Sequence, residues 1–221
     1  MKNPDLLTVA RALREKALRP SRLLPLIFMT DPARISDPIG LILSLPKSVN
    51  GHMTIILRHF GDENRLQTAR ELRQLSFARD MQLLIGNDPE LAIACGADGI
   101  HYTRAAEPQT IAMWKHRCPD WIVSQAGKKD PLAYIDPNND AAKQSEESLA
   151  HLDGLFISSV FESTSPSAGS PIGVSAFSAL CRKLDVAVFA LGGITPQTAS
   201  TLMGSGTAGL ASVSAIKGLA V

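Results

Sequence analysis

The sequence predicts an α/β protein folded as a single (β/α)8 TIM barrel, and two observations lead to that prediction. Short apolar runs rich in Ile, Leu, Val and Phe alternate with stretches of helical spacing, as is typical of parallel β/α units. A chain of 221 residues, 45% of them hydrophobic, can also bury a sizeable core as one domain. We therefore expect residues 1–221 to form one domain, with an N-terminal helix in 1–20 and the barrel in 24–216.

The apolar runs place the expected elements along the chain. The expected strands are 24–30, 53–60, 81–85, 99–103, 121–125, 154–161, 187–191 and 209–214. Helical spacing predicts helices at 63–79, 89–95, 175–183 and 195–203. Pro32 and Pro38 interrupt the segment 31–45, and turn residues in 130–152 predict a loop followed by a helix near 141–151.

The two ends of the barrel segment predict a departure from a regular (β/α)8 pattern. Apolar residues before the first strand fall at helical spacing, so we expect an extra helix there that plugs the bottom of the barrel. Few residues follow the eighth run, so we expect a truncated or missing eighth helix. The extra helix, or a partner subunit in a homodimer, would cover that gap.

The charge balance and the cysteines favour a small-molecule ligand and a reducing compartment. The chain has 22 basic and 21 acidic residues without a run of like charge, so nothing indicates nucleic acid or an anionic membrane as a partner. Cys95, Cys118 and Cys181 form no C-x-x-C pair, which argues against a zinc site or a disulfide framework. No segment reads as a signal peptide or a membrane span, so we expect a soluble, cytoplasmic protein.

The seventh expected strand ends in a pattern suited to binding an anion. Gly192 and Gly193 follow the apolar run, and Thr195 and Pro196 suit the N-cap and first position of a helix. Two glycines allow the backbone to approach an anion, and the amides of the next turn can then point at it. The alternative is a tight strand-to-helix turn without a ligand.

The eighth expected strand supplies a second part of that site. It ends at Val213 and Ser214, with a hydroxyl and free amides. Barrels commonly build a phosphate site from the loops after strands seven and eight. We therefore predict phosphate binding at Gly192, Gly193, Val213 and Ser214, the alternative being that Ser214 is a capping residue.

Several motifs together resemble the thiamine-phosphate synthase and thiazole tautomerase family. They are L-I-F-M-T-D at 26–31, A-D-G-I-H at 97–101, A-L-G-G-I at 190–194 and V-S-A-I at 213–216. The resemblance implies a (β/α)8 barrel that binds a thiazole phosphate. It further implies either coupling to a pyrimidine pyrophosphate with the help of magnesium, or isomerisation of a thiazole phosphate carboxylate by a histidine, and no organic cofactor.

The second strand keeps one of the three polar side chains that the family has there. The family's Gln-x-Arg-x-Lys is matched by Ile56, Arg58 and Phe60, which we expect to point into the barrel. Arg58 is therefore a candidate catalytic residue that clamps a phosphate or carboxylate. The alternative is a structural ion pair at the strand end.

The resemblance implies that the magnesium ligands lie at the ends of strands three and four. Asn87 and Asp88 match the family's Asn-Asp, so Asp88 is the candidate magnesium ligand, although an N-cap role before Pro89 is equally expected. The family's second aspartate is replaced by Ala106, which argues against ordinary synthase chemistry.

Three polar residues near these strand ends are further candidates for contact with the ligand: Asn87, His101 and Arg104. We expect Arg104 to bring positive charge to the site. We interpret His101 mainly as a hydrogen-bonded histidine at a strand end, the alternative being a ligand or proton-transfer role.

Strands five and six complete the candidate site. Ser124 matches the serine of the family's Ser-x-His and is the second candidate catalytic residue, whereas Ala126 replaces the histidine that a tautomerase needs. Ser163 and Ser165 stand where the family has threonines, so we expect them to contact the pyrophosphate or substrate. Pro166 replaces a lysine.

These substitutions leave three functions open. The first is a thiamine-phosphate synthase-like transferase of thiamine biosynthesis. The second is a catalytically impaired or repurposed barrel that binds a phosphorylated metabolite, or a thiazole tautomerase-like isomerase. The third, an unrelated phosphate-binding isomerase, normally places a carboxylate or lysine at a strand end, and the acidic residues there make no obvious pair.

Overall fold

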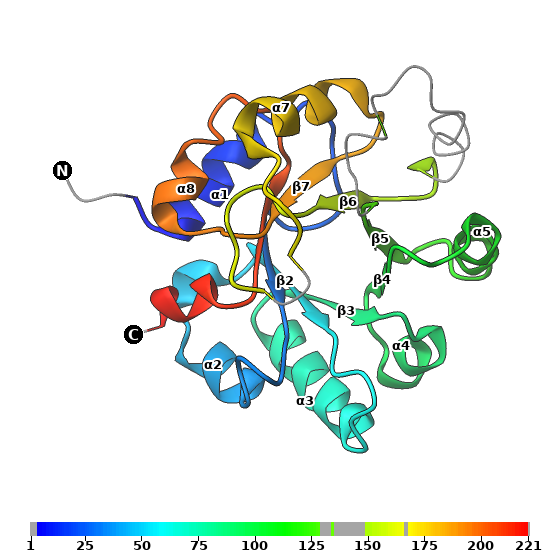
Figure 1. The fold of residues 1–221 in the computed structure, drawn as a ribbon. Helices are drawn as coiled ribbons and strands as arrows, with labels where there is room; N and C mark the ends of the chain where they lie inside the picture. The colour runs from blue at the N-terminus through cyan, green and yellow to red at the C-terminus, as the bar shows by residue number, and fades with distance from the viewer. Residues whose placement is uncertain (1–3, 129–133, 135–148, 166–167, 221) are drawn as a thin grey trace.

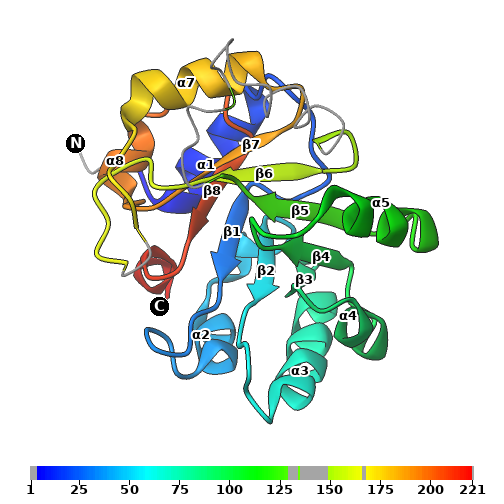
Figure 2. The same cartoon turned by 45° about the vertical axis from the view of Figure 1, so that its right-hand side comes forward.

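The computed structural model describes residues 4–128, 134, 149–165 and 168–220. Eight parallel strands close into a barrel in the order of the sequence, with β8 hydrogen-bonded to β1 (Figures 1 and 2). The prediction of a (β/α)8 barrel is therefore confirmed. Within the described residues, no helix combines the length and the apolar character needed to cross a membrane.

All eight strands lie within or beside the runs expected from the sequence. They are β1 Leu26–Met29, β2 Met53–Leu57, β3 Gln82–Gly86, β4 Gly99–Tyr102, β5 Ile122–Ala126, β6 Gly154–Ile157, β7 Val188–Leu191 and β8 Gly209–Ser212. Two expected strands, 53–60 and 154–161, extend too far. Beyond Leu57 and Ile157 the chain has left the sheet and forms the loops that carry Arg58 and Ser163.

The helices surround the barrel and largely follow the helical spacing of the sequence (Figure 2). The described helices are α1 Leu6–Glu15, α2 Pro38–Ser44, α3 Arg65–Ala78, α4 Pro89–Cys95, α5 Pro108–Arg117, α7 Gly173–Lys183 and α8 Pro196–Ser200, with 3-10 turns η1 Lys47–Val49 and η3 Ala215–Leu219. Helix α2 begins at the second proline because Asp37 caps it by accepting a hydrogen bond from the Gly40 amide. Most of the helix expected near 141–151 lies outside the described residues.

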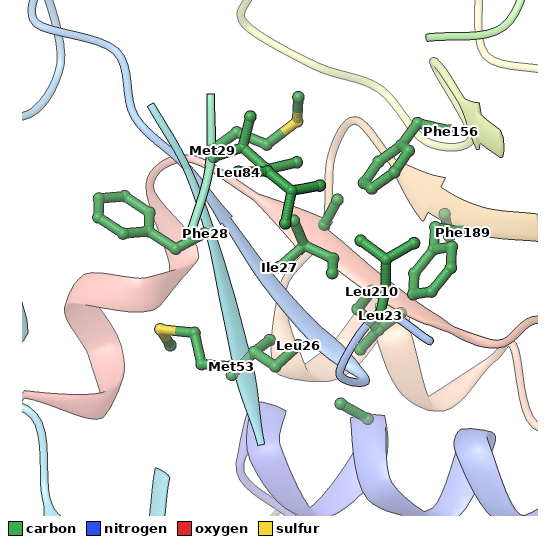
Figure 3. Packing of buried hydrophobic residues seen from close by; sticks show 14 of the residues in the cluster. Leu23, Leu26, Ile27, Phe28, Met29, Met53, Leu84, Phe156, Phe189 and Leu210 are labelled. Carbon is green, nitrogen blue, oxygen red and sulfur yellow. The ribbon is translucent and has the colours of Figure 1, made fainter. Parts of the chain in front are cut away.

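Alternate strand residues fill the barrel interior with apolar side chains. Ile27 and Met29 on β1 lie toward Phe156 and Phe189, whereas Phe28 points to the other side of the strand (Figure 3). The rings of Phe156 and Phe189 stack with centroids 5.2 Å apart and planes 13° apart. The interior is therefore a packed core, and the space for a ligand lies at the strand ends.

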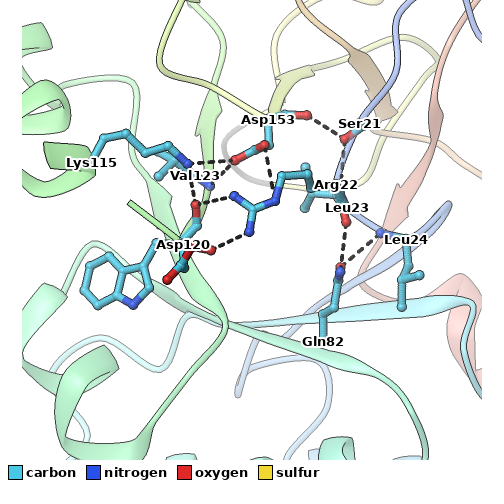
Figure 4. Close-up of polar contacts among 10 residues, drawn as sticks. Ser21, Arg22, Leu23, Leu24, Gln82, Lys115, Asp120, Val123 and Asp153 are labelled. Atoms are coloured by element: carbon cyan, nitrogen blue, oxygen red, sulfur yellow. Dashed lines mark hydrogen bonds and ion pairs between the residues drawn. The ribbon is translucent and has the colours of Figure 1, made fainter. Parts of the chain in front are cut away.

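The segment before β1 closes the bottom of the barrel (Figure 4). The Arg22 guanidinium donates to the carbonyl oxygens of Asp120 and Trp121, and the Arg22 carbonyl accepts from Gln82 Nε2 at 2.8 Å. These bonds hold Leu23 with no exposed surface. A Cβ atom at Gly154 would lie 2.5 Å from Leu23 Cδ1, so Leu23 packs directly against the barrel floor.

Helix α1 does not plug the barrel bottom, so that expectation was wrong. Its apolar face contacts α8, β8 and β1 on the outside of the barrel, where an eighth helix would otherwise lie (Figure 1). The short turn η3 follows β8 in place of a full eighth helix, as expected. Because α1 covers the gap, the gap itself gives no reason to expect a partner subunit, and the homodimer stays a prediction.

Candidate functional site

A cavity of ≈ 660 Å³ opens at the carboxyl ends of β1, β2, β6, β7 and β8. Seven of the residues predicted from the sequence line it, and they follow four different strands, β2, β6, β7 and β8: Arg58, Ser163, Ser165, Gly192, Gly193, Val213 and Ser214. Among the described residues, the lining includes none from β3, β4, β5 or the loops that follow them. The sequence-predicted site is therefore divided between two sides of the barrel.

The Gly192–Gly193 turn brings β7 and the loop after β6 into direct backbone contact. Both glycines have positive φ, 92° and 66°. A Cβ atom at Gly193 would lie 2.3 Å from the Glu162 carbonyl oxygen, so a side chain there has no room. Phe161 donates its amide hydrogen to the Gly192 carbonyl. The two glycines are therefore required both by the backbone conformation and by the close approach of this loop.

The helix start after the glycines is formed as the sequence predicts. Thr195 is the N-cap of α8, its hydroxyl accepts from the Thr198 amide at 3.2 Å, and Pro196 follows at the first helical position. The Thr198 hydroxyl accepts in turn from the Thr195 amide at 2.9 Å, which completes a capping box. Thr198 also lines the cavity and was not anticipated.

Several backbone amides at the cavity wall donate no hydrogen bond within the described part of the protein. Among the described residues, the amides of Gly193, Ile194 and Ser214 have no acceptor within the protein. The Ser212 hydroxyl accepts from the Ala215 amide at 3.0 Å and so fixes the turn after β8. Unpaired amide donors that line a cavity favour an anion there.

Arg58 stands at the end of β2 and lines the cavity. Its Nε donates to the Thr30 carbonyl at 3.0 Å, and its backbone amide donates to the Thr30 hydroxyl at 2.9 Å. Its Nη2 lies 3.9 Å from Asp31 Oδ2. Burial lowers the pKa of the Arg58 guanidinium, as does the nearby Arg34, whereas Asp31 raises it. The ligand and ion-pair interpretations of Arg58 are thus compatible.

Arg34 is a cavity-lining cation that the sequence interpretation missed. It follows Asp31 by three residues, with its Nε 3.5 Å from Asp31 Oδ2. The spacing D-x-x-R directly after an apolar strand was the available sign, because a charged pair at that position lies at the carboxyl end of the barrel.

The two predicted serines of the loop after β6 also line the cavity. The Ser163 hydroxyl accepts from the Ser165 amide at 3.3 Å. Pro166 lies outside the described residues.

Phe60 does not point into the barrel, because β2 ends at Leu57. Instead, its exposed ring lies under the Arg65 guanidinium, whose carbon atom is 5.3 Å from the ring centroid. Arg65 in turn forms an ion pair with Asp88 at 2.9 Å. The expectation of three alternate inward side chains therefore holds for Ile56 and Arg58 but not for Phe60.

Asp88 caps α4, as the alternative interpretation expected. Its Oδ1 accepts from the Leu91 amide at 3.0 Å, while Oδ2 faces Arg65. Magnesium needs several oxygen ligands, but here one carboxylate is fully engaged and Ala106 supplies none. Within the described part of the chain, no three His, Cys, Asp or Glu side chains are grouped to hold a metal ion. These residues do not fit a magnesium site.

His101 and Ser124 form a buried pair on the neighbouring strands β4 and β5. His101 Nδ1 lies 3.0 Å from the Ser124 hydroxyl, and the His101 ring packs edge-on against Phe156. Burial, followed by the charge of Arg58, lowers the pKa of His101 to about 3. The imidazole is therefore neutral at ordinary pH, in agreement with its interpretation as a hydrogen-bonded histidine.

The remaining candidates lie away from the cavity. Asn87, with a positive φ of 53°, and Arg104 are both exposed on the loops after β3 and β4. Neither belongs to the described cavity lining, and Ser124 does not either. Asn87, Arg104 and Ser124 are therefore not part of the described cavity lining, and the roles assigned to them stay predictions.

Comparison with known proteins identifies relatives of this barrel. Residues 28–216 match the family model described as thiamine monophosphate synthase. A putative thiamine-phosphate synthase 2 of Aquifex aeolicus is 28% identical over 153 residues, which are 69% of this chain and 75% of that protein. The thiamine-phosphate synthase of Herpetosiphon aurantiacus is 26% identical over 181 residues, 81% of each chain.

A solved structure shares the fold. The thiamine phosphate pyrophosphorylase of Pyrococcus furiosus superimposes with a TM-score of 0.66 at 20% identity, covering 93% of this chain and 90% of that one. At this identity the likeness establishes the barrel architecture alone. The match to the family model, which includes the glycine turn and the end of β8, carries the relationship.

Proposed function

The chain belongs to the thiamine monophosphate synthase family, and on that premise we propose that its cavity binds the phosphate group of a phosphorylated thiazole in thiamine biosynthesis. The observation that carries the proposal is the set of unpaired amides of Gly193, Ile194 and Ser214 in the cavity wall. Amides fixed by a glycine turn and a capped helix start need no reorganisation to receive an anion.

The phosphate would lie between the turn after β7 and the turn after β8. These strands are hydrogen-bonded neighbours, since Leu191 pairs with Ala211, so the two turns leave the sheet side by side. Hydrogen bonds from amides to a charged phosphate are stronger than those between neutral groups. The thiazole ring would then extend over Met29 and Leu191, two apolar residues of the lining.

The first candidate activity is coupling of this thiazole phosphate to a pyrimidine pyrophosphate. In that reaction the thiazole nitrogen attacks the pyrimidine methylene carbon, and the carbon–oxygen bond to pyrophosphate breaks with its electron pair on the leaving oxygen. Neutralising that charge would require cations, and Arg34 and Arg58 are the cationic side chains in the described lining. Ser163 and Ser165 would add hydroxyl contacts.

The second candidate is a repurposed barrel that binds a phosphorylated metabolite without this coupling. It is favoured by the pairing of Asp88 with Arg65 and α4, and by Ala106, because together they remove the carboxylates that a magnesium-assisted reaction needs. For either candidate, free thiols at Cys95, Cys118 and Cys181 support the proposal of a reducing compartment such as the cytoplasm.

Calorimetry with thiazole phosphate and with the matching thiazole alcohol tests the binding proposal. The phosphate should bind at least tenfold more tightly, since hydrogen bonds to a charged group are worth about 1.5–3 kcal/mol. Ser214→Pro removes one amide donor at a residue whose φ of −90° is near that of proline. It should weaken phosphate binding about tenfold, whereas Ser214→Ala, which keeps the amide, should not.

Equal binding of the phosphate and the alcohol would refute the proposal, as would equal affinities of the two Ser214 variants. The coupling reaction is tested separately by supplying pyrimidine pyrophosphate and measuring thiamine phosphate. Folded protein that binds thiazole phosphate but forms no product, beside an active relative, would leave the second candidate. Product formation that Arg58→Gln abolishes would support the first.

A further inference from the structure

We propose that Glu162 forms a cation subsite in the cavity, and that this subsite selects a phosphate ester whose aromatic ring carries a positive charge. The inference rests on the proposed function, because it concerns the ring of a ligand whose phosphate lies at the glycine turn. It deepens that function by assigning the charge of the ring, to which the amides of the phosphate site do not respond.

Glu162 is held beside the phosphate site by the backbone of its own loop. The Phe161 amide donates to the Gly192 carbonyl at 3.2 Å. The Glu162 carbonyl oxygen lies 2.3 Å from the place that a Cβ atom of Gly193 would take. The loop after β6 therefore runs alongside the turn after β7, and from there the Glu162 side chain lines the cavity.

The Glu162 carboxylate has no counter-ion within the described part of the protein. The other charged side chains of the described lining are Asp31, Arg34 and Arg58. Asp31 Oδ2 lies 3.5 Å from Arg34 Nε and 3.9 Å from Arg58 Nη2, so both cations already face another carboxylate. No ion pair of Glu162 is found among the described residues. The two guanidinium groups and two carboxylates sum to zero, and Glu162 is the member without a partner.

A bound phosphate increases the need for a positive charge near Glu162. A phosphate monoester carries about −1.5 to −2 charge at pH 7, and the charged side chains of the described lining do not offset it. Backbone amides stabilise the phosphate through their dipoles, but they bring no net charge. A neutral ring would therefore leave the phosphate and Glu162 to repel each other beside the same turn. A cationic ring removes that repulsion.

The apolar residues of the lining indicate an aromatic cation. Met29 and Leu191 line the cavity, and Leu191 directly precedes the glycine turn. A compact ammonium group is strongly hydrated, and it would lose that hydration against apolar side chains. An azolium ring spreads its charge over several atoms and loses less. We therefore assign to the cavity a phosphate ester linked to an azolium ring, with the ring over Leu191 and its charge beside Glu162.

This assignment gives Glu162 a role in the first candidate activity. When the thiazole nitrogen uses its lone pair to bond the methylene carbon, the ring becomes a thiazolium cation, and the electron pair of the broken carbon–oxygen bond leaves with pyrophosphate. The ring charge develops during the reaction, so Glu162 stabilises the transition state more than the neutral substrate. In a protein that catalyses the coupling, Glu162→Gln should lower kcat without weakening the binding of thiazole phosphate, and an unchanged kcat would overturn this role.

Calorimetry with a matched pair of phosphate esters tests the cation subsite itself. One ester carries an N-methylthiazolium ring, and the other carries the neutral thiophene in which a carbon atom bearing the same methyl group replaces the nitrogen. Because Glu162 is exposed, the cation should bind only about fivefold more tightly, and the preference should shrink at high salt. Equal affinities at low salt would overturn the inference. An equal gain from an aminoalkyl phosphate over its alkyl counterpart would overturn the assignment of an aromatic cation.

Two variants locate the preference for the cation. Glu162→Gln keeps the size of the side chain and removes its charge, so it should abolish the preference. The matched control Glu90→Gln, at an exposed glutamate of α4, should keep it. A preference that survives Glu162→Gln would overturn the inference, including the case in which Asp31→Asn removes it instead.

The thiophene phosphate separates this inference from the function on which it rests. If this ester binds and Ser214→Pro weakens it, but the thiazolium ester binds no more tightly, the phosphate site stands and the cation subsite fails. If neither ester binds, or Ser214→Pro leaves both affinities unchanged, the proposed phosphate site fails and the cation subsite fails with it.

Discussion

One face of the barrel has two regions that differ in the groups they present. The first lies at the carboxyl ends of β7 and β8, and the second at the carboxyl ends of β3 to β5. At β7 and β8, backbone amides and glycines line an open cavity. At β3 to β5, the side chains are used within the protein: Asp88 caps α4 and pairs with Arg65, and His101 is buried against Ser124. A site made from backbone depends on a few glycines, whereas a site made from side chains needs a particular residue at each position.

The largest effect on stability and on phosphate binding is expected at Gly193, in the region built from backbone. In Gly193→Ala, the new Cβ would lie 2.3 Å from the Glu162 carbonyl oxygen, at a φ of 66°. Backbone strain and overpacking should together lower the free energy of unfolding by roughly 3–5 kcal/mol. Any folded fraction should have lost affinity for a phosphate ester, as measured by urea denaturation and calorimetry.

Gly204 provides the matched control. It also has a positive φ, 85°, but a Cβ atom there would meet nothing within 4 Å. Gly204→Ala should therefore cost about 1 kcal/mol, through backbone strain alone. Equal losses in the two variants would mean that the approach of the β6 loop is not what requires Gly193.

A smaller effect on stability is expected in the region of β3 to β5, where His101 is buried. Because its pKa falls from 6.5 to about 3 in the folded protein, the unfolded chain binds one more proton between these values. Its contribution to stability is therefore complete above pH 6.5 and is lost as the pH falls. Between pH 7 and pH 5 the free energy of unfolding should decrease by about 2 kcal/mol, as measured by urea denaturation.

The variant His101→Gln should show a flatter pH dependence over this range, whereas His116→Gln, at an exposed histidine of α5, should keep that of the unmodified protein. An unchanged slope in His101→Gln would contradict the assignment of a neutral, buried imidazole.

The strands were predictable from the sequence, but their ends and their neighbours were not. Apolar runs such as the one that forms β7 must be buried, and this fixes where each strand lies. Arg34 was missed because its importance depends on Arg58, which follows the next strand and lies near it only once β1 and β2 have paired. Helix α5 was missed because Ile111 and Trp114 are the two apolar residues that it buries, too few for a clear period.

The smallest expected effect concerns Asp88. In Asp88→Ala, loss of the N-cap and of the Arg65 pair should lower the free energy of unfolding by roughly 1–2 kcal/mol. Binding of a phosphate ester should not change, because Asp88 lies outside the described cavity lining. Asp37→Ala, which removes the cap of α2 alone, provides a comparison for stability. A tenfold loss of binding in Asp88→Ala would remove the distinction between the two sides of the barrel.

The position of α1 has a consequence for the order in which the chain folds. Residues 6–15 contact β1, but they pack more extensively against α8 and β8, and β8 begins at Gly209, so most of the surface that α1 covers is absent until almost the whole barrel has been synthesised. At about 5–20 residues per second, that interval lasts roughly 10–40 s. An isolated helix of this length is marginally stable in water. During translation α1 is therefore an exposed apolar segment that chaperones can bind, and its full docking is a late step that covers the junction of β8 and β1.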